Sequence, residues 1–200
     1  MQAFKSLDAV AVPIARPNVD TDQIVPARFL RKPRSSGYGN YLFHDLRLDR
    51  EGRERDFVLN KPAYRDAKIL VAERNFGCGS SREHAVYALW DFGIRAVIAP
   101  SFGDIFFGNS FMNGLLLIVL PAADVAALIG ALDAKPGAHM RVDLAAQTVT
   151  GADGKTCRFD IDAYRKRCLL EGLDELAFTL SRRDAIKAFE QKHAADMPWV

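Results

Sequence analysis

Residues 68–90 read KILVAERNFGCGSSREHAVYALW and decide the fold, because they run from a strand into a helix through two glycines. Residues 68–72 are an apolar, strand-like run, and residues 85–90 continue at helical spacing. The turn between them presents free backbone N–H groups at the positive end of a helix. We therefore expect a carboxylate or phosphate to bind in this turn.

Side chains of the turn suit the same ligand. Gly77 and Gly79 let the backbone bend sharply and approach a ligand closely. The hydroxyl of Ser80 and the guanidinium of Arg82 can point at one spot, where both would donate hydrogen bonds to an anion.

Other interpretations of the turn compete with anion binding. Ser80 and Glu83 fit an S-x-x-E capping box, which would explain both residues without a ligand and can also coexist with a site. A dinucleotide fingerprint is set aside, because Arg82 replaces its third glycine and no acidic residue ends the strand at 95–99. Cys78 precedes a helix N-terminus and could be a nucleophile, but no residue is marked as its base.

The segments after the turn repeat the same alternation. The pattern predicts β-α-β-α-β, with strands at 68–73, 95–99 and 115–120 and helices at 81–92 and 104–112. Strands this apolar are buried on both faces, as in a parallel sheet whose ligands collect at the carboxyl ends. Residues 100–104 follow the middle strand, so we expect them to form a wall beside the 75–82 turn.

Before this pattern, residues 8–15 read as a strand, and the turn formers at 18–22 predict a tight polar loop after it. We do not expect this loop to bind calcium, because Ile24, Val25 and Pro26 replace the ligands and glycine of a calcium loop. Residues 31–61 are rich in Gly, Arg and Asp, which predicts a long irregular segment with one hairpin at most.

Beyond the repeated pattern, residues 140–144 and 157–161 alternate around a turn at 151–154, which predicts an antiparallel second sheet. Helices are expected at 163–171 and 182–193, and Gly172 ends the first of them.

Size and composition indicate one α/β domain spanning residues 1–200. The chain is 49% hydrophobic and 26% charged, and its net charge of +2 is too small to argue for nucleic acid or membrane binding. No signal peptide is readable at the N-terminus, and Pro121 and Asp124 interrupt the apolar stretch 115–132. The cysteines, three in number and without C-x-x-C spacing, favour a reducing compartment, the cytoplasm, over a disulfide framework or a metal cluster held by this chain alone.

Three blocks of sequence, residues 18–26, 75–84 and 99–106, resemble the small-subunit family of the 3-isopropylmalate dehydratases, within the aconitase superfamily. The likeness also includes residues 41–45 and 162–165 and covers essentially the whole chain. It implies a swivelling β/β/α domain of three layers, with a central parallel sheet plus an antiparallel sheet. It also implies docking on a separate large subunit that carries a [4Fe-4S] cluster, so that this chain alone is inactive and binds no metal itself.

The reaction implied by the resemblance is a step of leucine biosynthesis, in which 2-isopropylmalate becomes 3-isopropylmalate through dehydration to isopropylmaleate and rehydration. One iron of the cluster acts as the Lewis acid for the leaving hydroxyl. Small subunits of related hydro-lyases, acting on citraconate, dimethylmalate or homoaconitate, are the enzyme alternative. An anion-sensing module that uses the same glycine turn is the non-enzymatic one.

The family's site residues map onto the turn. Its base falls on Ser80, the next serine of the substrate site is Ser81, and the arginine for the substrate carboxylate is Arg82. A serine must lose its proton to act as a base, and the helix N-terminus, nearby N–H donors and Arg82 could stabilise the resulting charge. Glu83 and His84 match the motif and are expected to cap and pack.

Substrate recognition is implied for residues 27–32. Phe29 and Leu30 could form an apolar wall for an isopropyl group. Arg31 adds a positive charge to a loop that would otherwise be apolar or neutral. This charge could favour a second carboxylate on a longer substrate. A second active-site arginine, which aconitase has, is left unassigned in residues 31–61.

Overall fold

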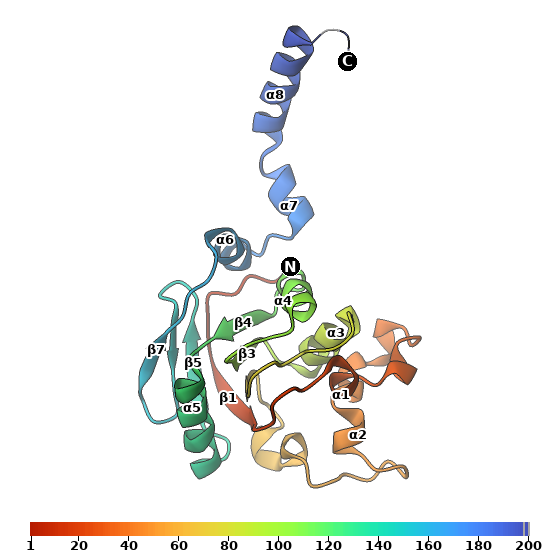
Figure 1. Cartoon of the computed structure of the whole chain (residues 1–200), viewed down its shortest axis with the longest axis vertical. Coiled ribbons are helices and arrows are strands. Elements are labelled where there is room, and N and C mark those ends of the chain that lie inside the picture. The colour runs from red at the N-terminus through yellow and green to blue at the C-terminus, as the bar shows by residue number, and fades with distance from the viewer. Residues whose placement is uncertain (198, 200) are drawn as a thin grey trace.

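The computed structural model describes residues 1–197 and 199 as a mixed sheet flanked by helices, from which a C-terminal arm extends (Figure 1). Within the described part of the chain the strands are β1 (Ser6–Ile14), β2 (Ile69–Ala72), β3 (Ala96–Ala99), β4 (Leu116–Val119), β5 (His139–Asp143), β6 (Thr148–Thr150) and β7 (Thr156–Arg158). The α-helices are α1 (Thr21–Ile24), α2 (His44–Arg47), α3 (Glu83–Phe92), α4 (Asp104–Met112), α5 (Ala122–Ala134), α6 (Ala163–Glu171), α7 (Glu175–Leu180) and α8 (Arg183–Asp196).

One sheet contains all the strands, in the order β4-β3-β2-β1-β5-β6-β7. Strands β1 to β4 are parallel, and β5 to β7 are antiparallel. Residues 11–14 of β1 pair with β2, whereas residues 6–10 pair with β5. The antiparallel strands therefore continue the parallel sheet instead of forming the separate sheet that we predicted, because β1 is long enough to serve a different neighbour with each half.

The inner parallel strands β2 and β3 are buried on both faces, as predicted. Alternate residues such as Leu70 and Val97 face a core that includes α3, whereas Ile69 and Ile98 face a second core that includes α5. This alternation follows from the two-residue period of a strand, so a strand with helices on both sides has to be apolar throughout.

Most of the predicted elements are present, with shifted ends. Helix α3 begins at Glu83 instead of residue 81, and the strand expected at 157–161 is the shorter β7. Strand β6 and helix α7 were not predicted. In the irregular segment, short 3-10 turns and α2 surround an antiparallel bridge between Leu48 and Glu54, which matches the expected hairpin. Among the described helices, none has the length and apolar character that crossing a membrane requires.

Candidate functional site

Three loops that leave the carboxyl ends of β1, β2 and β3 meet at one place. The amide of Gly77 in the second loop donates to the carbonyl of Val19 in the first, over 2.7 Å. The amide of Gly103 in the third loop donates to the carbonyl of Phe76, over 3.0 Å. Two isolated parallel β-bridges also join these loops, one between Asp20 and Cys78 and one between Phe76 and Phe102. The wall that we expected at 100–104 therefore lies beside the glycine turn, because β1, β2 and β3 are neighbours in the sheet.

The two glycines of the turn meet different constraints. Both have a positive φ, 72° at Gly77 and 89° at Gly79, a conformation that L side chains rarely adopt. A Cβ at Gly77 would lie 2.3 Å from the ring of Phe106, whereas one at Gly79 would make an ordinary 3.5 Å contact with Asp20. Gly77 thus lets the turn pack directly on α4, whereas Gly79 is needed only for the positive φ of the bend.

Ser80 is not a helix cap, which corrects the capping-box alternative. The cap residue of α3 is Arg82, and no side chain there caps the helix. Glu83 accepts a hydrogen bond from Asn113 over 2.9 Å instead of capping. The reason is that α3 begins later than the sequence pattern indicated, so that Ser80 and Ser81 precede it as exposed residues. The carbonyl of Ser80 accepts from the Thr21 hydroxyl over 2.9 Å, which fixes the backbone below the two serines.

Arg82 is paired with a carboxylate of this chain. Its Nη1 and Nη2 donate to both oxygens of Asp22, with 2.7 Å between Nη2 and Oδ2. The hydrogen bonds from Arg82 hold the pKa of the Asp22 carboxyl below its usual range, and the pair raises the pKa of Arg82. The Arg82 side chain is only 13% exposed. Its guanidinium is thus fixed at the edge of the turn, with two of its nitrogens engaged.

Cys78 lies in the turn as a half-buried free thiol. Burial raises the pKa of this thiol above its ordinary value of 9.0, and the negative charge of Asp20 raises it further. The thiol is therefore neutral at pH 7, which argues against the nucleophile considered from the sequence.

The predicted recognition loop is partly occupied by its own packing. Phe29 stacks on Tyr41 with ring centres 4.3 Å apart and planes 9° apart. Leu30 is half-buried against the core, and Arg31 is exposed. The ring of Phe29 also carries the guanidinium of Arg28 at 4.6 Å. The loop is thus ordered by aromatic stacking, and the Phe29 face used for Tyr41 is not free for a ligand.

A shallow cavity of about 360 Å³ lies next to the turn, with Asp20, Asp22, Arg28 and Asp45 in its wall. Arg28 donates to both oxygens of Asp45, and His44 contacts the same carboxylate. The Arg28 hydrogen bond, with a smaller contribution from His44, lowers the pKa of Asp45 to about 2. The predicted site residues do not line this cavity: neither Ser80, Ser81 and Arg82 of the turn nor Phe29, Leu30 and Arg31 of the loop are in its wall. The structure therefore does not bring the two groups together there.

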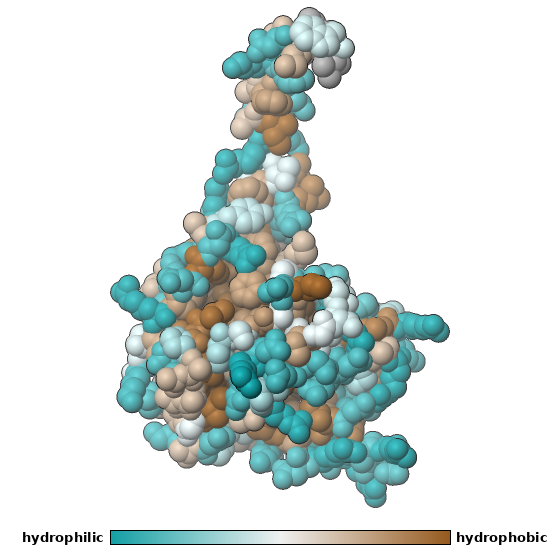
Figure 2. Space-filling model, viewed as in Figure 1, coloured by the Kyte–Doolittle hydropathy of each residue, from teal (hydrophilic) through white to brown (hydrophobic). Residues whose placement is uncertain are grey.

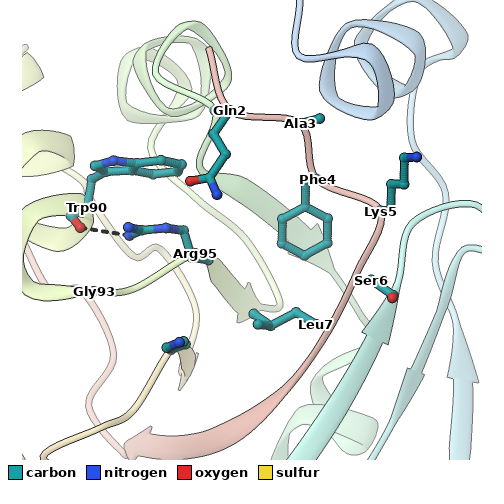
Figure 3. Close-up of a pocket in the computed structure, with 11 residues that line it drawn as sticks. Gln2, Ala3, Phe4, Lys5, Ser6, Leu7, Trp90, Gly93 and Arg95 are labelled. Carbon is teal, nitrogen blue, oxygen red and sulfur yellow. Dashed lines mark hydrogen bonds between the residues drawn. The ribbon is translucent and has the colours of Figure 1, made fainter.

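Another cavity, of about 290 Å³, lies at the opposite ends of the parallel strands (Figure 3). Gln2 and Phe4 line one side and Trp90 and Arg95 the other. The Arg95 guanidinium lies 3.9 Å from the Trp90 ring and donates to the Trp90 carbonyl over 2.7 Å. Because Lys68 and Arg95 precede β2 and β3, this cavity is remote from the glycine turn.

His84 packs between aromatic rings, as expected, with ring centres 5.6 Å from Tyr38 and 5.7 Å from Tyr87. Among the described residues, no three His, Cys, Asp or Glu side chains gather closely enough to hold a metal ion. Cys157 and Cys168 are free thiols like Cys78. Within residues 1–197 and 199, the side chains therefore do not form a ligand set for an iron–sulfur cluster.

Asp22 is the site residue that sequence reasoning missed. In the sequence, Asp20 and Asp22 resemble only the start of a calcium loop. The position of Asp22 in a polar loop after a strand could have indicated that it belongs to the site, because such loops meet at the carboxyl edge of a parallel sheet. Its partner could not be identified, since Arg82 is 60 residues away in the sequence.

Comparison with known proteins gives matches along nearly the whole chain. Residues 1–123 match a family model described as the aconitase C-terminal domain. Residues 126–163 match a model described as LeuD_N, and residues 177–200 match a model of the C-terminal domain of 3-isopropylmalate dehydratase small subunits.

Relatives at high identity carry one name. Proteins called 3-isopropylmalate dehydratase small subunit from Jannaschia sp., Paramagnetospirillum magneticum and Ruegeria sp. are 54%, 52% and 51% identical, each over the full length of both chains. A crystal structure titled 3-isopropylmalate dehydratase, from Methanocaldococcus jannaschii, is 27% identical with a TM-score of 0.65. It covers 92% of this chain and 99% of its own.

Proposed function

The chain belongs to the family of 3-isopropylmalate dehydratase small subunits, and from this we propose that it converts 2-isopropylmalate to 3-isopropylmalate together with a large subunit. The reaction removes water to give isopropylmaleate and adds it back with the hydroxyl on the neighbouring carbon. This reaction is a step of leucine biosynthesis. The chain would contribute the glycine turn and its side chains to the active site. The observation that carries the proposal is the exposed Ser80, which follows two glycines of positive φ and is not used as a cap.

Ser80 is the base that we propose for the proton beside the substrate carboxylate. A serine hydroxyl gives up its proton only where the charge left on oxygen is stabilised. The free amides at the start of α3 and the nearby Arg82 cation favour that charge, and more strongly once water is excluded. Ser80 is exposed in this chain, so the exclusion of water has to come from the partner.

Arg82 is proposed to hold the substrate carboxylate, with Ser81 donating from the same turn. Asp22 takes hydrogen bonds from Nη1 and Nη2, and a guanidinium has five N–H donors. The edge formed by Nε and the outer hydrogen of Nη2 remains for a second carboxylate, in the paired geometry that arginine favours. On this proposal Asp22 orients the guanidinium and the substrate approaches its other edge.

The isopropyl group is assigned to the loop that contains Phe29 and Leu30. Leu30 is half-buried, and the Phe29 ring contacts Tyr41 and the Arg28 guanidinium, so these side chains would have to rearrange to meet the substrate. Arg31 is exposed beside them and could meet a second carboxylate. Movement of this loop toward the turn on assembly is part of the proposal.

The [4Fe-4S] cluster expected for the family is proposed to belong to the large subunit, since the part of this chain that the structure describes gathers no ligand set. The chain, built on its one mixed sheet, would act as a swivelling domain that closes over the partner in a heterodimer. Free thiols support a reducing compartment, and we propose the cytoplasm.

Reconstitution tests the proposal. The chain is mixed with a cluster-loaded large subunit, and hydration of isopropylmaleate is followed by its absorbance. We expect turnover only in the mixture, and Ser80→Ala should lower kcat by roughly 10²- to 10⁴-fold, as for loss of a general base. Ser6→Ala, an exposed serine on β1, is the matched control and should retain full turnover.

Two results would contradict the proposal. Absence of turnover with an active large subunit would remove the function from this chain. Full turnover by the Ser80→Ala variant would leave the function but remove Ser80 as its base.

A further inference from the structure

Helix α8 is an exposed element that lacks packing partners in this chain. It has 14 residues and is about 21 Å long, yet none of its residues is buried. Isolated helices of this length are marginal in water, and most helices in proteins are held by packing of an apolar face. The free chain therefore lacks the contact that would hold α8.

An apolar stripe marks the face of α8 that such a contact would use. Ile186 and Phe189 are three residues apart and are 40% and 66% exposed. The ring of His193 extends the stripe, 5.6 Å from Phe189. On α7, Leu176 and Leu180 are four residues apart and also exposed. Figure 2 shows hydrophobic residues along the protruding arm, interspersed with hydrophilic ones.

The arm (residues 175–197 and 199) holds most of the large apolar side chains that the described structure exposes. Ten are exposed in all, and six belong to the arm: Leu176, Leu180, Ile186, Phe189, Met197 and Trp199. Phe189 and Trp199 alone could bury roughly 100–190 Å² each, given the usual area of an aromatic side chain. The arm can therefore supply much of the approximately 800 Å² that one partner contributes to a stable interface.

The apolar surface of the arm continues toward the candidate site. At the root of the arm, Phe178 meets Tyr164 at 4.7 Å, and Tyr164 meets Phe111 of α4 at 5.9 Å. Along α4, Met112 and Ile105 are exposed and seven residues apart, so they share a face. Ile105 follows the loop whose Gly103 amide bonds to the glycine turn, so this surface begins beside the site and ends at the tip of the arm.

We propose that this surface, formed by Ile105 and Met112 of α4 and by Leu176, Leu180, Ile186 and Phe189 of the arm, docks the large subunit. The inference rests on the proposed function, which requires another polypeptide to cover Ser80, and the Ile105 end of this surface lies beside that turn. The segment 177–200 matches a model specific to small subunits, which by their name have a larger partner. Four acidic and four basic residues balance in 175–196, so apolar burial rather than net charge would drive the contact.

Hydrogen exchange tests the docking without altering the chain. In the free chain the amides of α8 should exchange quickly, because the helix opens easily. Adding the large subunit should slow exchange across residues 183–196 by at least about tenfold. Unchanged exchange in a complex of confirmed stoichiometry would overturn the proposal.

A pair of matched variants tests the stripe itself. Ile186→Ser with Phe189→Ser removes the stripe, whereas Lys187→Ser with Gln191→Ser places the same residues on the opposite face. The first pair should raise by at least about tenfold the concentration of large subunit that gives half-maximal turnover, in keeping with the loss of buried anchors. Turnover at saturation should stay unchanged, because neither pair touches the glycine turn. The second pair should behave as the unaltered chain.

The outcomes separate the two proposals. If the unaltered chain gives no turnover at any concentration of large subunit, the proposed function has failed. If it is active and both variant pairs titrate alike, only the docking surface is overturned. Light scattering of the chain alone should show a monomer. If it shows a dimer, and the Ile186→Ser/Phe189→Ser variant is a monomer, the surface binds a second copy of this chain instead.

Discussion

At the scale of single residues, Gly77 and Gly79 look equivalent in the sequence and differ in the structure. We expect Gly79→Ala to lower the free energy of unfolding by about 1–2 kcal/mol, the cost of a positive φ for an L residue. Gly77→Ala should cost roughly 2–5 kcal/mol, since overlap with the Phe106 ring adds to that strain. Urea unfolding of the two variants measures the difference.

Phe106→Leu provides the control for this difference. In combination with Gly77→Ala it should relieve part of the overlap, so that the double variant loses less stability than the two single changes added together. With Gly79→Ala the two costs should add. Equal costs of the two glycine variants would show that Phe106 moves aside freely.

Residue types indicated much of the site, but not its pairings. Ser80, Ser81 and Arg82 stand out because two glycines precede them at a strand-to-helix turn. The salt bridge of Arg82 with Asp22 and the stacking of Phe29 on Tyr41 depend on how separate loops meet. Local sequence carries no information on such meetings, which is why the pairing of Arg82 with Asp22 was not predicted.

At the scale of elements, the helices differ in what they contribute to the folded body. Deleting residues 182–200 should change the free energy of unfolding by less than about 0.5 kcal/mol, because α8 buries no residue. Leu169→Ala in α6 should cost about 2–5 kcal/mol, since Leu169 is 2% exposed in the core. Thermal or urea unfolding of both variants measures the contrast, and a deletion as costly as Leu169→Ala would mean that α8 packs on the body in solution.

Element types were predictable where hydrophobic period and length agreed. Strands β2 and β3 and helices α4 and α6 lie close to their predicted bounds, because apolar strands and amphipathic helices have distinct periods. The start of α3 was misplaced because S-x-x-E is only a local signal, and here Ser80 is used to join the turn to Thr21. Strand β6 was not predicted, because a strand of three residues is too short to show an alternation of apolar and polar residues.

At the scale of the whole molecule, assembly should change the reactivity of one cysteine and not of another. Cys78 lies in the glycine turn and Cys157 on β7, and burial raises the pKa of both thiols. Both should therefore react slowly with a maleimide at pH 7, and faster by about tenfold per pH unit until pH passes the raised pKa. Adding the large subunit should protect Cys78 and leave Cys157 unaffected.

Mass spectrometry of the labelled peptides measures this protection, and Cys157 serves as the internal control. Equal labelling of Cys78 in the free chain and in the complex would mean that the partner leaves the glycine turn open. That result would also remove the closed environment that the charge on Ser80 requires.

The sequence by itself determined the α/β class, the apolar strands, the bend at the glycine turn and the family, because these depend on local period, backbone freedom and order of motifs. The tertiary structure decided that β1 joins both halves into one sheet and that loops at 18–22, 75–82 and 101–104 meet. It also decided that Asp22 holds Arg82 and that α8 stands unpacked. These features depend on contacts between residues far apart in the chain, whose free energy no local window of sequence contains.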